Sequence, residues 1–253
     1  MRMKEKKKSK NRKKILITVL LSLVFMILVP MRASASTVNV NVNGKGVDTL
    51  QIIELFTIMA LLPSILIMTT CFGRIIIVLS FLRNALGLQQ TPPNQVLIGI
   101  ALFLSLFIMR PVASQINTEA YQPYKEQKIT QEQFIQKASG PMKEFMLKQT
   151  KKDDLNLFID LSKTKDVKSI NNLSLTVIIP AFMTSELKRA FTIGFLIFIP
   201  FIIIDMIVSS TLMSMGMVML PPAMISLPFK LLLFVLVDGW GLLFKSLVAG
   251  FNM

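Results

Sequence analysis

Long apolar runs separated by short polar stretches dominate this chain. Four of them follow residue 50: Leu55–Leu82, Val96–Met109, Ala190–Ile204 and Leu231–Phe251. A helix that crosses a membrane needs about 20 apolar residues, so the pattern predicts an all-α, multi-pass membrane protein. Each run is too short, too long, charged, or interrupted by proline or glycine. Such helices are tolerated where they face protein or a water-filled cavity, which predicts broken helical hairpins that are stable mainly inside an assembly.

The first two runs depart from a simple span in opposite ways. Leu55–Leu82 is long for one crossing, and Pro63 and Gly73-Arg74 interrupt it. An arginine in mid-membrane costs about 2.5–3.5 kcal/mol, so we expect a kinked or broken helix with Arg74 facing protein or water. The second run stops at Arg110-Pro111. Its length of about 21 Å falls short of a hydrocarbon core of about 30 Å.

Residues 114–176 are different, because they hold ten lysines and eight acids. A capping-box pattern at 130–133 predicts a helix start. Gly140 predicts the end of this helix, and Pro141 suits the first turn of the next. Asp153-Asp154 are expected to cap a third helix. The pattern therefore predicts a small soluble helical segment between two membrane hairpins.

The beginning of the chain has the pattern of a secretory signal peptide. A lysine-rich stretch, the apolar run Ile15–Val29 and the small residues Ala33-Ser34-Ala35 follow one another. The alternative is a retained first membrane helix, but Pro30 and Arg32 close the apolar run early.

We therefore expect five parts. They are a signal peptide (1–35), a flexible mature N-terminus (36–49), a first membrane hairpin (50–113), a soluble helical segment (114–178) and a second membrane hairpin (179–253). With an exported N-terminus and four crossings, the soluble segment and the C-terminus lie outside the cytoplasm.

Composition supports a membrane protein and argues against several other classes. Hydrophobic residues make up 53% of the chain and its mean hydropathy is +0.61. The net charge of +14 is concentrated in the first 35 residues, and no aromatic-interleaved basic groove follows, which argues against nucleic-acid binding. The chain has no histidine and a single cysteine, Cys71, so the commonest general base and the commonest metal-ligand clusters are missing. We therefore expect no catalytic residue, no cofactor and no metal. Ser185 and Lys188 could imitate a Ser–Lys dyad, but the simpler interpretation is a polar stretch at the entrance of a helix.

Residues 213–222, called the methionine loop below, carry the most unusual pattern. Met213, Met215, Met217 and Met219 recur at every second position, which is not a helical stripe. Gly216 weakens a helix here, and we expect the following prolines at 221–222 to end it. Flexible, apolar thioethers seal irregular gaps, so from this stretch alone gap-filling core is the simpler interpretation.

Charged residues beside or within the apolar runs form a second set of candidates. Asp205 and Asp238 qualify by their intramembrane placement. The alternative roles are a structural ion pair or a helix-end cap. Arg74, Arg110 and Lys188 are possible partners, and the sequence leaves their pairing open.

Two stretches resemble the signatures of the FliP family, which serves flagellar and virulence type III secretion: residues 180–195 and 228–240. Thr192 departs from the first signature, which usually has a charged or amide residue there. The resemblance extends over 50–113 and 119–161, and the signal peptide favours the flagellar branch. The signature residues are Pro180, Glu186, Gly194, Pro228, Lys230, Gly239 and Trp240.

The resemblance implies a function. Members of this family form the core of a protein export gate in the bacterial cytoplasmic membrane, at the flagellar basal body. Five copies assemble with FliQ and FliR into a closed helical cone, with contacts to FlhB and FlhA, membrane lipid and unfolded exported polypeptides. The proton-motive force and an associated ATPase supply the energy.

The resemblance also implies that a methionine-rich loop forms a constriction, or gasket, across the export channel. By motif position, this gasket corresponds to Met217 and Met219, with Met215 and Gly216 beside them. Val218 stands where the family often has a third methionine. Competing hypotheses are a virulence-type export gate, a structural scaffold, a small-solute transporter coupled through the intramembrane aspartates, and a membrane hydrolase. No inverted repeat supports a transporter, and the absence of histidine argues against a hydrolase.

Overall fold

The computed structural model describes residues 40–42, 45–47, 49–162, 173–217 and 219–251. The predicted signal peptide, half of the predicted flexible N-terminus and Val218 lie outside them. The described chain is helical apart from one short hairpin, which confirms the all-α fold. Its elements are β1 (Val40–Val42), β2 (Lys45–Val47), α2 (Thr49–Thr69), α3 (Phe72–Ala85), α4 (Asn94–Ile116), the π-helix η1 (Asn117–Tyr121), α5 (Gln122–Lys125), α6 (Gln131–Gln149), α7 (Lys152–Leu161), α8 (Leu175–Ser214), α9 (Pro222–Leu236) and α10 (Gly239–Ala249).

The chain divides into two compact units, Met1–Ile58 and Met59–Met253. In the first unit, β1 and β2 pair antiparallel with Val40 opposite Val47, and the first turns of α2 follow. The second unit holds the other helices and the hydrophobic core.

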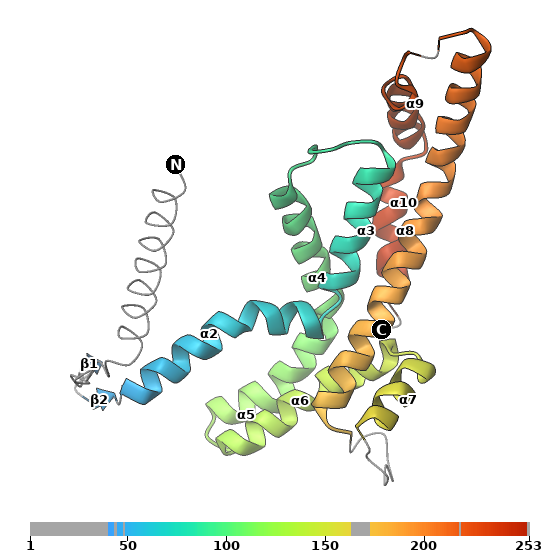
Figure 1. Cartoon of the computed structure of the whole chain (residues 1–253). Helices are drawn as coiled ribbons and strands as arrows, with labels where there is room; N and C mark the ends of the chain where they lie inside the picture. Colours follow the sequence, from blue (N-terminus) through green and yellow to red (C-terminus); the bar gives the residue numbers. More distant parts are fainter. Residues whose placement is uncertain (1–39, 43–44, 48, 163–172, 218, 252–253) are drawn as a thin grey trace, which may run out of the picture. The chain divides into compact units, whose positions relative to one another are not determined.

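Helix α3 carries much of the core of the second unit and packs against both α4 and α8 (Figure 1). Ile75, Val78, Leu79 and Leu82 recur at helical spacing and are buried. Because this stripe faces two helices at once, α3 joins the N-terminal and C-terminal halves of the unit. The buried residues that meet it include Leu97, Ala101 and Ile108 of α4 and Ile178 and Phe182 of α8.

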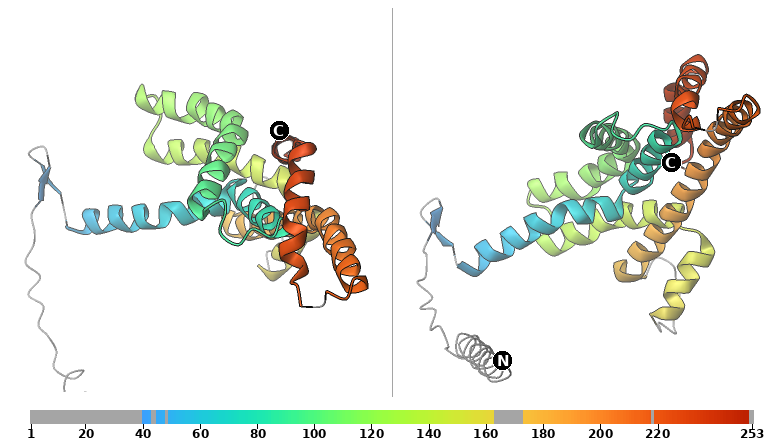
Figure 2. Two further views of the ribbon diagram at one scale, coloured as in Figure 1. Left: turned by 90° about the horizontal axis from the view of Figure 1, so that it is seen from above. Right: turned by 45° about the horizontal axis from the view of Figure 1, so that its top comes forward.

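Helix α8 is one continuous helix of 40 residues with Pro180 and Pro200 in its interior (Figure 2). The third apolar run is therefore not broken at its internal proline, Pro200. A proline removes one backbone N–H, and in apolar helices neighbouring groups compensate for that loss. Asp205 consequently lies within α8, about two and a half turns before its end.

Residues 130–161 of the polar segment form two helices, α6 and α7, where three were predicted. The capping box at Thr130 is confirmed, but α6 continues through Gly140 and Pro141 to Gln149. A helical glycine costs about 1 kcal/mol, whereas burial of a large apolar side chain contributes about 1.5–3 kcal/mol. Phe145 and Met146, both buried one turn later, offset the cost of the interruption. Helix α7 begins one residue before Asp153-Asp154, so these acids lie in its first turn rather than at its cap.

The first apolar run is broken at residues 70–71, just before Gly73-Arg74, with Cys71 buried beside the break. The predicted interruption at Pro63 is wrong, because α2 continues through it. The second run differs from expectation, because α4 passes through Arg110-Pro111 and ends at Ile116. The last run is divided, since α9 and α10 are bent by 62°.

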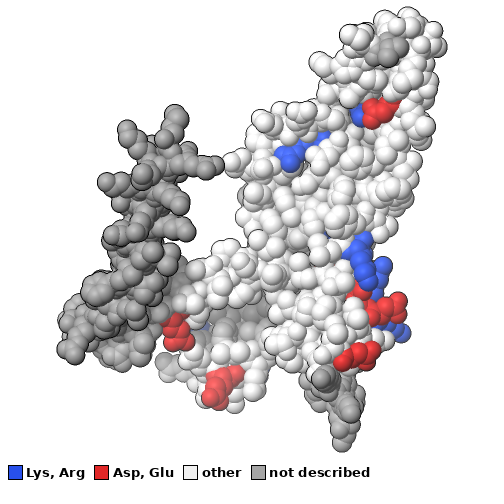
Figure 3. Space-filling view, in the orientation of Figure 1, with Lys and Arg blue, Asp and Glu red and all other residues white. Residues whose placement is uncertain are grey.

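Three of the described helices, α2, α4 and α8, are long and apolar enough to cross a membrane, and α9 with α10 makes a fourth if the bent pair counts as one span. Much of the face in Figure 3 is uncharged, and its charged side chains gather at a few places. The division into two membrane hairpins around a soluble segment stays a prediction; its boundaries at 113 and 178 fall inside α4 and α8.

Candidate functional site

The methionine loop connects α8 to α9, and backbone hydrogen bonds fix its first half. Gly216 has φ +73°, a left-handed conformation that favours glycine. Its N–H donates to the Met213 carbonyl at 3.1 Å, and the Met217 N–H donates to the Leu212 carbonyl at 3.0 Å. These two bonds make a Schellman motif that ends α8. The sequence motif thus produces a sharp reversal at a defined residue.

The prolines after this reversal begin a helix instead of ending one, which corrects the prediction for residues 221–222. Pro221 is the N-cap of α9 and Pro222 is its first residue. A proline suits this place because the N–H it lacks would have no partner in the first turn. The methionine loop is therefore a short connection between two helix ends.

The methionines of the loop are largely exposed. Met219 is 96% exposed, and Met213 and Met215 are 66% and 65% exposed. Met217 is half-buried. In this chain the thioethers do not fill a core gap, so the gap-filling interpretation is wrong for the loop.

Asp205 and Lys230 pin the helices that flank the loop. Lys230 Nζ donates to Asp205 Oδ2 at 2.6 Å, and Ser226 Oγ donates to Asp205 Oδ1 at 2.6 Å. Lys230 and Ser226 are buried and lie one turn apart on α9. Asp205 thus belongs to a structural ion pair. Its partner, Lys230, is not one of the three cations that the sequence suggested.

Beside this pair lies an apolar groove of about 450 Å³ between α8 and α9. Ile204, Ile207 and Val208 line it from α8, and Ile225 and Phe229 line it from α9. Pro228 lies inside α9 without ending the helix. The base of the methionine loop therefore has an uncovered apolar flank.

Asp238 is a helix cap, one of the two alternatives that the sequence left open. It has φ +49° and ψ +54°, and its carboxylate accepts from the Gly241 N–H at 3.4 Å. A Cβ at Gly239 would lie 2.2 Å from the Phe234 ring, so only glycine fits there. Trp240 packs edge-on against Phe234 with ring centroids 5.3 Å apart. These signature residues form the bend between α9 and α10.

Arg74 faces protein, as predicted, and its partner is Glu186. Both side chains are 2% exposed, and Arg74 Nε donates to Glu186 Oε2 at 2.8 Å, with a second bond from Nη2 to Oε1. Arg74 Nη1 also donates to the Gly250 carbonyl at 3.2 Å, and the guanidinium lies 3.8 Å from the centre of the Phe251 ring. One bidentate pair thereby ties α3, α8 and the end of α10 together.

One turn of α8 also holds the polar segment. Ser185 Oγ donates to Asp154 Oδ2 at 2.6 Å and accepts from the Lys151 N–H at 3.0 Å, and Lys188 donates to Asp154 Oδ1. Burial alone raises the pKa of the Asp154 carboxyl, but the hydrogen bonds from Lys188 and Ser185 outweigh it and hold that pKa below its usual value. Ser185 and Lys188 are thus a docking point for α7, not a catalytic dyad.

Gly194 is a signature residue with a packing role. A Cβ there would lie 2.5 Å from two atoms of the Phe81 side chain. Phe81 packs edge-on against Phe191 and Phe198, with ring centroids 5.4 Å and 6.0 Å away. Glycine therefore lets α3 approach α8 closely.

Pro180, another signature residue, lies inside α8, five residues after its start.

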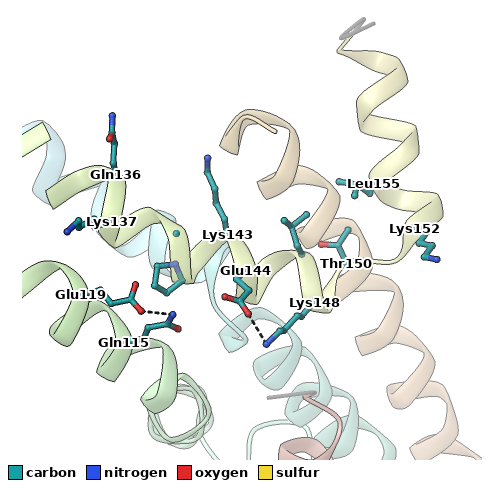
Figure 4. Close-up of a pocket in the computed structure, with 13 residues that line it drawn as sticks. Gln115, Glu119, Gln136, Lys137, Lys143, Glu144, Lys148, Thr150, Lys152 and Leu155 are labelled. Carbon is teal, nitrogen blue, oxygen red and sulfur yellow. Dashed lines mark hydrogen bonds and ion pairs between the residues drawn. The ribbon is translucent and has the colours of Figure 1, made fainter. Parts of the chain in front are cut away.

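A polar groove of about 910 Å³ lies between α6 and the α4–η1 junction (Figure 4). Gln115 donates to Glu119, and Lys148 pairs with Glu144. Lys137, Lys143 and Lys152 line the groove, and Figure 4 shows that they do not converge on one point. The described residues hold no group of three acids, cysteines or histidines able to bind a metal.

Sequence reasoning missed the partners of the charges. The sequence pattern predicts that Asp154 caps a helix, and it does not single out Ser226 or Phe81. One signal was present, because Ser226 and Lys230 are polar residues four apart in an apolar helix and therefore share a face. Nothing in the local pattern marked Phe81.

Comparison with known proteins agrees with the two signatures. Residues 55–247 match the FliP family. The chain is 57% identical to the flagellar biosynthetic protein FliP of Bacillus subtilis (strain 168) over 203 residues, which is 80% of this chain and 92% of the relative. It is 52% identical to that of Pectobacterium carotovorum subsp. carotovorum (80% and 79% covered) and 50% identical to that of Aquifex aeolicus (strain VF5) (83% and 88% covered). The chain belongs to the FliP family.

Proposed function

We propose that this chain is a channel-forming subunit of the flagellar type III protein export gate, and that it passes unfolded flagellar proteins across the bacterial cytoplasmic membrane. Its relatives are named flagellar biosynthetic proteins, which supports a place in the flagellar export apparatus. The observation that carries the channel role is the methionine loop, a hydrogen-bonded reversal at which Met213, Met215 and Met219 are exposed and Met217 is half-buried.

The chemistry of thioethers suits a gate. An apolar constriction dewets and so blocks ions and small molecules. Unbranched thioether chains deform around a polypeptide of varied sequence and close behind it. Met217 and Met219 form the seal in this proposal, and Met213 and Met215, at the end of α8, support it.

Several copies must meet for this loop to close a channel. Many large apolar side chains on α2, α4 and α9 are exposed in the single chain, which favours assembly. We propose five copies on one axis with FliQ and FliR, contacts to FlhB and FlhA, and surrounding lipid. The Asp205–Lys230 pair would hold each loop at the same height.

Substitution of the two sealing methionines tests the gate. In Met217→Ala/Met219→Ala, the constriction widens and loses apolar surface, so the assembled complex should conduct ions in a planar bilayer while cells still export flagellar proteins. Met206→Ala is the matched control, since Met206 is exposed on α8 outside the loop. Unchanged conductance in the double variant, or the same leak in the control, would reject the gate.

A scaffold without a channel is the second candidate, because exposed apolar helices also suit a purely structural subunit. Cysteines placed at 217 or 219 should crosslink to a stalled export substrate if the loop lines the channel. Crosslinks only to neighbouring subunits would favour the scaffold.

A further inference from the structure

The methionine loop differs from the rest of the chain in how its sulfur atoms meet solvent. Among the large hydrophobic residues that the structure describes, Met219 is the most exposed, whereas Met146 in the core is 1% exposed. Met217 and Met219 lie outside helices; Met219 is almost fully exposed, and Met217 is half-buried. An oxidant dissolved in water therefore reaches these thioethers before the buried ones.

A thioether exposed in this way reacts with peroxides. The sulfur lone pair attacks one peroxide oxygen, the O–O bond breaks, an S–O bond forms, and the second oxygen leaves as water. The methionine is oxidised to its sulfoxide, and the peroxide is reduced. The product is polar, and reductases specific for each sulfoxide epimer return it to the thioether.

We propose that Met219, together with Met217, is a site of reversible oxidation whose sulfoxide form opens the closed gate to ions. This inference rests on the proposed gate. A dewetted constriction depends on apolar walls, and each sulfoxide places a strong hydrogen-bond acceptor in that wall. Each chain around the axis contributes the same methionines to the constriction. Oxidation of only some of the chains therefore already lets water into the seal.

Other exposed methionines lie on different surfaces. Met206 on α8 and Met224 on α9 are also exposed in the single chain, but they belong to long apolar helices, which lipid or neighbouring subunits would cover in the proposed assembly. Their oxidation would not change the wall of the constriction. They serve as internal references for exposure without a gating role.

The first test maps the reaction. The assembled complex is treated with hydrogen peroxide, and its peptides are analysed by mass spectrometry for a gain of about 16 Da per added oxygen. Met219 should be modified before Met206, and Met146 should stay reduced. Modification of Met206 ahead of Met219 would overturn the assignment of the site.

The second test measures the consequence in a planar bilayer. Peroxide should raise the ion conductance of the native complex, and methionine sulfoxide reductase should return it to its starting value. Met217→Leu/Met219→Leu keeps apolar walls but has no sulfur there to oxidise, so its conductance should not change on treatment. Met206→Leu should respond as the native complex does.

The outcomes separate this inference from the function on which it rests. Oxidised Met219 without a rise in conductance overturns the switch, and so does an equal rise in the double leucine variant. If the reduced Met217→Ala/Met219→Ala complex leaks but the oxidised native complex does not, the gate stands and the oxidation site fails. If neither leaks, the gate itself fails.

Discussion

At the scale of single residues, the buried charges of this chain are paired across long stretches of sequence. Arg74 and Glu186 are almost fully buried and form a bidentate ion pair. Such a pair contributes little net stability relative to apolar residues, but loss of one partner strands the other charge. The pair therefore specifies how α3 meets α8 more than it strengthens the contact.

Glu186→Gln should lower the free energy of unfolding of the purified complex by about 3–5 kcal/mol, because Arg74 keeps its charge without a counter-ion. Denaturant unfolding followed by circular dichroism measures this. The exposed pair Glu144–Lys148 gives the control, and Glu144→Gln should cost less than about 0.5 kcal/mol. Arg74→Met/Glu186→Leu should recover most of the loss; a double variant as unstable as Glu186→Gln would contradict this account.

Asp154 gives a pH dependence with a defined sign. Its folded pKa is below the ordinary value, so its stabilising effect is present above that value and is lost as pH falls through the folded pKa. Amide exchange in α7, corrected for intrinsic rates, should therefore accelerate only below about pH 4. Asp154→Asn should exchange faster at neutral pH and lose this dependence, whereas Asp153→Asn, at an exposed site, should behave as the native chain. An unchanged pH profile in Asp154→Asn would assign the effect to another group.

At the scale of elements, the α3–α8 contact depends on a missing side chain. Gly194→Ala places a Cβ against Phe81, and overpacking of this kind costs about 1–3 kcal/mol. Thermal unfolding should show the loss, and Phe81→Leu in the same chain should relieve part of it. Gly140→Ala is the control, because nothing lies within 4 Å of its Cβ and alanine favours a helix. Equal destabilisation by both substitutions would point away from the contact with Phe81.

Local signals predicted local features of the elements. The capping box at Thr130 and the break near Gly73-Arg74 follow from side chains within a few residues of the feature. Proline and glycine gave wrong predictions where packing decides the outcome, as at Pro63, Gly140 and Pro141. A glycine in a helix costs about 1 kcal/mol and a proline about 3 kcal/mol or more, and burial of side chains against distant residues offsets this cost.

Only part of the candidate site could be predicted from the sequence. The alternating methionines and Gly216 marked the loop, because they are neighbours in the chain. The sequence marks Asp205 as a candidate, but it does not identify Lys230 as its partner, because 25 residues separate the two. Pairing of charges depends on helix packing, which the periodicity of a single helix does not encode.

At the scale of the whole molecule, the surface of one chain is unsuited to water. Phe103, Val235 and Leu236 are each 74% exposed on apolar helices. Exposed apolar faces of this kind indicate contact with lipid or with other subunits.

We expect folding to be linked to association. The midpoint of thermal unfolding in mild detergent should therefore rise with protein concentration, because dilution favours the separated chains. Scanning calorimetry over a tenfold concentration range, combined with native mass measurement, tests this. A folded, non-aggregating monomer with a concentration-independent midpoint would contradict it.

The continuity of α8 gives the chain a mechanical property. From Ser185, where α7 docks, to Ser214 at the methionine loop, an unbroken helix extends about 44 Å. The close contact at Gly194 lies nearer the docked end and makes a natural fulcrum. From Gly194 to Ser214 the helix extends about 30 Å, so a tilt of about 5° about this contact shifts the loop by about 2.6 Å. Helix α8 thus links the docking point of the polar segment to the methionine loop, so a small rearrangement at one end would displace the loop at the other.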